Sequence, residues 1–84
     1  MNFYCSAPTA TQVSLVGDFN NWDNSSHPLQ KAPDGVWFLS VEMYHGHQRY
    51  AFMVDGQLTL DDQAQGITRN DQGERVSLIS VSGF

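Results

Sequence analysis

A chain of 84 residues has room for one hydrophobic core, so we expect residues 1–84 to form a single domain. Four Lys and Arg against nine Asp and Glu give a formal net charge of −5, which disfavours nucleic acid and anionic membrane surfaces as partners. Cys5 is the only cysteine and no apolar run approaches the roughly 20 residues of a membrane-spanning helix, so we expect a cytoplasmic domain that needs no disulfide, metal or organic cofactor.

The first half of the chain predicts short strands separated by polar turns. Residues 2–6 alternate apolar and polar side chains, as a half-buried strand does. Residues 12–18 carry a β-branched, alternating run and predict a second strand. The polar stretch 19–27 is expected to hold no helix. A brief edge strand follows over residues 28–31, because Pro28 cannot donate to a sheet and Lys31 is a charge that protects sheet edges.

The second half continues in the same way. Pro33-Asp34-Gly35 predicts a tight turn, and Asp55-Gly56 predicts a two-residue hairpin. Between and after these turns we expect a strand over 36–44, a strand over 48–54, a short strand over 57–60, a surface loop over 61–73 and a last strand over 75–81. No segment has a long helical apolar stripe. The predicted fold is therefore all-β, an antiparallel sandwich of two sheets with six to eight short strands.

The corner from Gly17 to Trp22 is the most informative stretch. Gly17 permits close backbone approach, and Asn20-Asn21 is typical of turns. Trp22, at the end of this corner, has two interpretations: it plugs the edge of the core, or it presents a flat apolar ring to a ligand. An aromatic ring stacks on the apolar face of a sugar by the same burial and dispersion that fill cores.

With these elements placed, the chain resembles a known family. It is similar to the carbohydrate-binding modules of family 48, which include the glycogen-binding domain of the β subunit of AMP-activated protein kinase and the early-set domains that precede isoamylase and glycogen-branching catalytic domains. The resemblance covers roughly residues 3–81. It is carried by the strings Gly17-Asp18-Phe19-Asn20-Asn21-Trp22, Asp34-Gly35-Val36-Trp37 and Tyr50-Ala51-Phe52-Met53-Val54-Asp55-Gly56-Gln57.

The resemblance implies an immunoglobulin-like early-set sandwich and a non-catalytic site for α-1,4-linked glucan of the glycogen or starch type. In sugar-binding members that site has two Trp plates, a Lys on the strand before the Val-Asp-Gly turn and polar groups of the last loop, including an Asn. Trp22 matches the first plate. The Lys corresponds to Ala51, the second Trp to Leu58 and the Asn approximately to Val76, so we expect weak binding, in the millimolar range, from about 1–3 kcal/mol of stacking per ring.

Some contacts can replace the missing ones. Leu58 offers an apolar surface beside Trp22, and Arg49 shares a strand face with Ala51 and has donors for hydroxyl groups. The amides Asn21, Asn70 and Gln72 suit sugar hydroxyls, although each can instead stabilise its own loop. The predicted carbohydrate-binding residues are therefore Trp22, Asn21, Leu58, Arg49, Asn70 and Gln72.

Other chemistry receives less support from the sequence. His45 and His47 lack a third ligand and predict a solvated pair rather than a metal site. Asp61-Asp62, even with Asp55 or Asp71, lack the apolar pocket that would make one of them a general acid, so we expect no catalytic residues. Cys5 and Trp37 are expected to fill the core.

The alternative function is a protein-interaction or regulatory module, or a homodimer, that kept the sandwich and lost the sugar site. Ala51, Leu58, Val76 and Met53 would then form an exposed apolar patch.

Overall fold

The computed structural model of the chain describes residues 1–43 and 45–81. Its elements, in chain order, are β1 (Asn2–Ser6), β2 (Val13–Gly17), the one-turn 3-10 helix η1 (Asp18–Asn20), β3 (Gln30–Lys31), β4 (Val36–Ser40), β5 (Gly46–Val54), β6 (Gln57–Thr59), β7 (Gly66–Arg69) and β8 (Arg75–Val81). Within the described ranges, no helix is long and apolar enough to cross a membrane.

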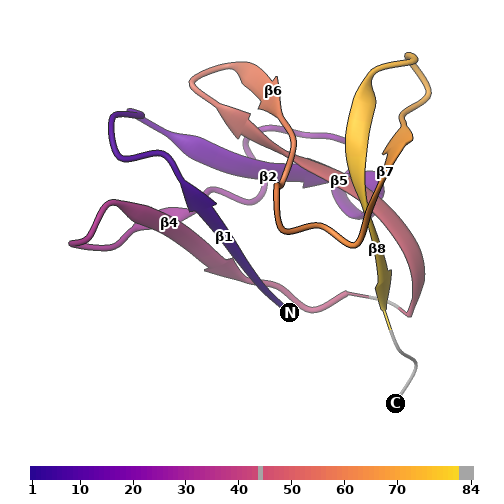
Figure 1. Cartoon of the computed structure of the whole chain (residues 1–84), viewed down its shortest axis with the longest axis horizontal. Helices are drawn as coiled ribbons and strands as arrows, with labels where there is room; N and C mark the ends of the chain where they lie inside the picture. The colour runs from indigo at the N-terminus through magenta and orange to yellow at the C-terminus, as the bar shows by residue number, and fades with distance from the viewer. Residues whose placement is uncertain (44, 82–84) are drawn as a thin grey trace.

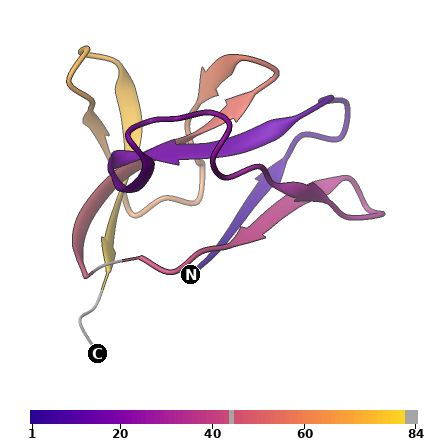
Figure 2. The same ribbon diagram turned by 180° about the vertical axis from the view of Figure 1, so that it is seen from behind.

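The strands form two antiparallel sheets (Figure 1). One sheet has the order β1-β4-β3, and the other has the order β2-β5-β8-β7 with β6 pairing to β5. Seen from behind, η1 and the polar loop after it pass beside β2, on the side of the larger sheet (Figure 2). This arrangement confirms the all-β antiparallel sandwich. It places β5 at the centre of the larger sheet, between β2 and β8.

The core lies between the sheets and consists of the inward side chains of β1, β2, β4, β5 and β8, together with Leu29. Phe3 and Trp37 come from the smaller sheet and meet Leu15, Tyr50 and Phe52 of the larger one. The rings of Phe3 and Tyr50 pack edge to face with centroids 5.0 Å apart. Trp37 is buried, and its indole N–H donates to the carbonyl oxygen of Ala7 at 2.9 Å. The predicted core position of Trp37 is therefore confirmed.

The Asp55-Gly56 hairpin is also confirmed. Val54 pairs with Gln57, and both turn residues have positive φ, 49° for Asp55 and 84° for Gly56. Such a turn matches the right-handed twist of the two strands that it joins. The carboxylate of Asp55 accepts hydrogen bonds from the backbone N–H groups of Thr11 and Gln12, so this residue also fixes the chain just before β2.

Several predicted strand ends shift by one or two residues, and three larger differences concern β4, η1 and β7. The strand expected over 36–44 ends at Ser40, which pairs with Asn2 at the start of β1; Tyr44 lies outside the described residues. The polar stretch after β2 contains η1. The loop expected over 61–73 contains β7, whose only large apolar side chain, Ile67, is 54% exposed. Pairing with β8, rather than an apolar pattern, makes this segment a strand.

Gly17 ends β2 where another backbone comes very close. A Cβ there would lie 2.5 Å from the carbonyl oxygen of Arg49 and 2.7 Å from a ring carbon of Phe19. We expect Gly17→Ala to lower the free energy of unfolding by about 1–3 kcal/mol, because the backbone of β5 must shift to make room. Urea unfolding measures this. Gly66→Ala is the control, since its Cβ would meet Leu78 only at 3.9 Å, and equal midpoints for the two variants would contradict the clash.

Candidate functional site

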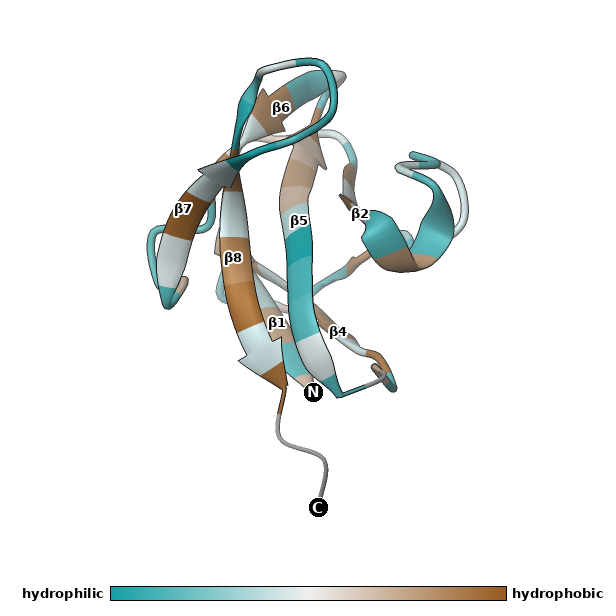
Figure 3. Cartoon of the chain, turned by 90° about the vertical axis from the view of Figure 1, so that its right-hand side faces the viewer, coloured by the Kyte–Doolittle hydropathy of each residue, from teal (hydrophilic) through white to brown (hydrophobic). Residues whose placement is uncertain are grey.

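The outer face of the larger sheet carries a second, smaller apolar cluster. Val16 of β2 pairs with Ala51 of β5, and Val76 of β8 lies in the same cluster. All three side chains are 0% exposed although they point away from the main core. Figure 3 views β7, β8, β5 and β2 side by side, with η1 beyond β2. Something must therefore cover this face, and Trp22, Met53 and Leu58 pack against the cluster.

The corner that carries Trp22 is held by Asn20. The side-chain oxygen of Asn20 accepts from the backbone N–H of Gly17 at 3.0 Å, and its amide N–H donates to the carbonyl oxygen of Leu15 at 3.0 Å. The same amide bonds Nδ1 of His27, whose ring packs edge to face on Phe19. His27 is thus half-buried and part of the corner.

Trp22 itself has an unusual backbone. Asn21 and Trp22 both have positive φ, 57° and 59°, and the N–H of Trp22 donates to the carbonyl oxygen of Gly17 at 3.0 Å. Positive φ is rare for a bulky residue and costs about 1–3 kcal/mol, and such strain concentrates at ligand sites. Trp22 is half-buried. It packs against the small cluster and also lines a pocket.

A pocket of about 310 Å³ opens beside Trp22, within the size range of small-ligand sites. Three separate segments form it, namely β2 with the corner that follows it, the hairpin of β5 and β6, and the turn between β7 and β8. Its lining residues are Val16, Asn21, Trp22, Met53, Leu58, Asn70, Asp71, Gln72 and Glu74. We call it the Trp22 pocket. Five of the six residues predicted from the sequence line it, and Arg49 does not.

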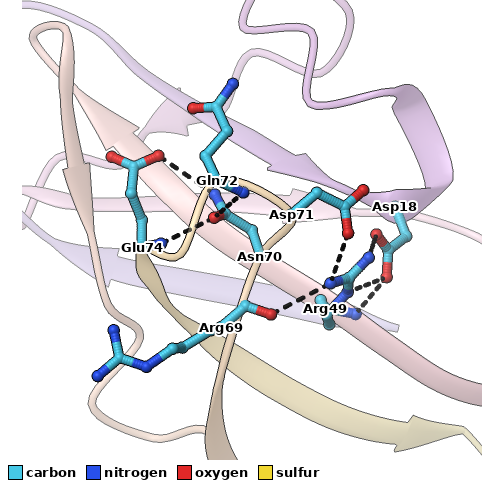
Figure 4. Close-up of polar contacts among 7 residues, drawn as sticks. All are labelled: Asp18, Arg49, Arg69, Asn70, Asp71, Gln72 and Glu74. Atoms are coloured by element: carbon cyan, nitrogen blue, oxygen red, sulfur yellow. Dashed lines mark hydrogen bonds and ion pairs between the residues drawn. The ribbon is translucent and has the colours of Figure 1, made fainter.

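The turn between β7 and β8 is organised by Asn70. Its side-chain oxygen accepts the backbone N–H groups of Gln72 at 3.0 Å and of Glu74 at 2.9 Å, and its amide donates to the Glu74 carboxylate at 3.2 Å (Figure 4). Asn70 therefore stabilises its own loop. The side chain of Gln72 extends away from these bonds (Figure 4). Asp71 and Glu74 were not foreseen as lining residues, and their place in a polar turn gave no signal for this.

Arg49 links the corner that carries Trp22 to the turn between β7 and β8. Its Nε and Nη2 donate to the two carboxylate oxygens of Asp18 at 3.0 Å each, on the side of the Trp22 corner. Its Nη1 donates to the carbonyl oxygen of Arg69 at 3.1 Å and to Asp71 at 3.3 Å, on the side of the β7–β8 turn (Figure 4). The guanidinium therefore holds together two of the segments that form the pocket.

The contact with Arg49 affects the pKa of Asp18. Burial opposes its ionisation, but hydrogen bonds and charge attraction from Arg49, together with a side-chain hydrogen bond from Trp22, lower its pKa below the ordinary 3.8. A carboxyl with a lowered pKa stabilises the folded state above its unfolded pKa, and this contribution is lost as the pH falls through the folded value.

Arg49→Gln tests this contact by its pH dependence. We expect wild-type protein to lose more stability than the variant as the pH falls from above 3.8 to below it. Urea unfolding at a series of pH values measures the difference. Arg75→Gln is the matched control, because Arg75 is an exposed arginine on β8. If Arg49→Gln and Arg75→Gln have the same pH dependence, the ion pair does not contribute.

Two other candidate residues, Asp61 and Cys5, contact side chains of the folded core. The hydroxyl of Tyr50 donates to the carboxylate of Asp61 at 2.6 Å, and burial and this bond raise the pKa of Tyr50. Asp61 also accepts the backbone N–H of Gln63. Burial, followed by the charges of Asp61 and Asp62, raises the pKa of the Cys5 thiol, which packs against the core.

His45 and His47 are exposed. Among the described residues, no three His, Cys, Asp or Glu side chains gather closely enough to hold a metal ion.

The apolar patch on which the alternative function rested is not exposed. Ala51 and Val76 are fully buried, and Met53 and Leu58 are half-buried. The reason is the Trp22 corner, which folds back over the outer face of the sheet and packs on these residues. Of the three cluster residues, Val16 lines the Trp22 pocket, and Ala51 and Val76 do not.

Comparison with known proteins gives one family. The model of the family described as carbohydrate-binding module 48 (isoamylase N-terminal domain) matches residues 1–78. Similar curated proteins are 1,4-alpha-glucan branching enzymes. That of Deinococcus radiodurans is 48% identical over 50 residues, which cover 60% of this chain and 7% of the enzyme. That of Novosphingobium aromaticivorans is 39% identical over 57 residues, covering 67% and 8%. The Aspergillus oryzae enzyme is 50% identical over 40 residues, covering 48% and 6%. The chain thus spans less than a tenth of the length of these relatives.

Proposed function

The chain belongs to the carbohydrate-binding module 48 family, and from this premise we propose that it binds α-1,4-linked glucan chains of the glycogen or starch type in the Trp22 pocket. The relatives support this polymer, since their names specify a 1,4-alpha-glucan. We further propose that residues 1–84 form one module, which presents glucan to a catalytic domain where it is part of a longer enzyme.

The observation that carries the proposal is the convergence of one aromatic ring and several neutral amides on one pocket. The Trp22 ring offers a flat apolar surface, on which the apolar face of a glucose ring stacks. Asn21 and Gln72 lie in the same lining and have both donors and acceptors for sugar hydroxyls. Leu58 and Met53 extend the apolar floor. A neutral, amphipathic ring such as glucose matches this combination of surfaces.

The same lining predicts that binding is weak. Stacking contributes about 1–3 kcal/mol per aromatic ring, and the Trp22 pocket has one such ring, with Leu58 where sugar-binding members have a second Trp. Ala51, at the position that the resemblance aligns with the family lysine, is buried and is not in the lining. We therefore propose a dissociation constant in the millimolar range for short glucans.

We propose no catalytic role for the module. Asp61, one of the carboxylates considered for glycoside hydrolysis, accepts hydrogen bonds from Tyr50 and Gln63. Its contacts are those of a residue that joins the segment after β6 to the core.

Electrophoresis in native gels that contain polysaccharide tests the ligand class. We expect glycogen and soluble starch to retard the protein, because multiple weak contacts along a polymer delay migration. Dextran, a glucan with mainly α-1,6 linkages, is the control and should leave the mobility unchanged. Equal retardation by dextran, or none by glycogen, would contradict the proposal.

A further inference from the structure

A second pocket lies directly beside the Trp22 pocket on the outer face of the larger sheet. It has a volume of about 340 Å³ and is lined by Gln12, Ser14, Asn24, Ser25, Pro28, Met53 and Gly56. Met53 lines both pockets. In the sheet, Met53 of β5 pairs with Ser14 on one side and with Leu58 on the other. The Met53 side chain is thus the wall between two adjoining hollows of similar size.

The lining of this second pocket is polar and uncharged. Gln12 and Asn24 are exposed and carry amides, and Ser14 and Ser25 carry hydroxyl groups. These groups both donate and accept hydrogen bonds, as sugar hydroxyls do. No charged side chain is in this lining, so it suits a neutral ligand rather than a phosphate or a carboxylate.

The loop that forms the outer wall of this pocket is already ordered. The Asp23 carboxylate accepts the backbone N–H of Ser25 at 2.9 Å and the hydroxyl groups of Ser25 and Ser26 at 2.8 Å each. The bonds from Ser25 and Ser26 lower the pKa of Asp23, so the loop keeps this anchor in neutral solution. The Ser25 oxygen can still accept a bond, and a preformed wall reduces the ordering cost of binding.

We propose that this hollow, the Asn24 pocket, is a second subsite for the same glucan chain, which crosses over Met53 from the Trp22 pocket. The inference rests on the proposed function, because the chain is anchored on Trp22. Its consequence is a preference for chain length: a disaccharide stacked on Trp22 leaves the Asn24 pocket empty, whereas a longer linear chain fills both.

The test compares maltose with maltoheptaose on wild-type protein and on the double variant Gln12→Ala/Asn24→Ala, by NMR titration. Both side chains are exposed, so the variant should fold normally. We expect it to bind maltose like wild-type protein and maltoheptaose roughly three- to tenfold more weakly, the loss of one or two hydrogen bonds. The side-chain amide signals of Asn24 should shift with maltoheptaose and not with maltose. Gln30→Ala, an exposed amide of the other sheet, is the control.

The outcomes separate the two proposals. If the double variant binds maltoheptaose as tightly as the Gln30→Ala control does, the second subsite is wrong and the Trp22 pocket alone binds glucan. If wild-type protein binds neither sugar, the proposed function fails and the subsite fails with it. A long chain can bind a single site in more registers than a disaccharide can, which raises its apparent affinity. This gain is the same for wild-type protein and for the double variant, so it does not affect their comparison.

Discussion

Trp22→Ala should reduce glucan affinity by roughly 5- to 100-fold, to the limit of detection by calorimetry or NMR. This range corresponds to the loss of about 1–3 kcal/mol of stacking. The protein should stay folded, because Trp22 is half-buried on the outer face of the larger sheet and the main core lies on the other face. We expect a modest loss of stability, about 1–3 kcal/mol, from the exposed Val16 and Val76 side chains.

Trp22→Phe is the matched variant, since it keeps a smaller aromatic ring at the same strained position. It should retain part of the affinity. A folded Trp22→Ala protein that binds glucan like wild-type protein would remove Trp22 from the site. An unfolded Trp22→Ala protein beside a folded Trp22→Phe protein would show that the ring is chiefly a packing element.

Leu58→Trp should have the opposite effect and raise the affinity for glucan by roughly 5- to 100-fold. Leu58 is half-buried on β6, faces Met53 across the strand pair and lines the Trp22 pocket. A Trp there adds a second stacking surface, worth about 1–3 kcal/mol, at the position that the resemblance aligns with a second Trp plate. Aromatic residues are also well tolerated in strands. Calorimetry with maltoheptaose measures the gain.

The control for an added surface Trp is Ile67→Trp. Ile67 is an exposed apolar residue of β7 and lines neither the Trp22 pocket nor the Asn24 pocket. A gain for Leu58→Trp alone locates binding on the outer face of the larger sheet. Equal gains for both variants would mean that added aromatic surface binds sugar anywhere, and no gain for Leu58→Trp would contradict the assignment of the pocket.

The sequence predicts those strands and turns whose own residues carry an alternating apolar pattern or a specific turn dipeptide. Asp55-Gly56 fixes its hairpin because two consecutive positive φ angles need these residue types, and the alternation around Trp37 identifies a half-buried strand. It does not predict β7, because Ile67 and Thr68 are ordered by pairing with Ser77 and Val76. Nor does it predict where β4 ends, since that depends on where β1 begins.

The same distinction between local pattern and distant contacts applies to the candidate site. Asn21, Trp22, Leu58, Asn70 and Gln72 were predicted from residue type and family resemblance, and the fold brings them to one pocket. Arg49 was expected among them, but its contacts depend on the distant Asp18 and Asp71, whose approach no local pattern encodes. The burial of Ala51 and Val76 was missed for the same reason, because it depends on how the Trp22 corner folds back.

An NMR titration with maltoheptaose tests the central claim most directly, because the two indole N–H signals of the protein respond independently. Trp22 lines the pocket, whereas Trp37 is buried and bonded to Ala7. We predict that the Trp22 signal shifts and saturates together with the amides of Asn21, Leu58 and Gln72, while the Trp37 signal stays in place. An unchanged Trp22 signal at saturating millimolar sugar would contradict glucan binding at this pocket.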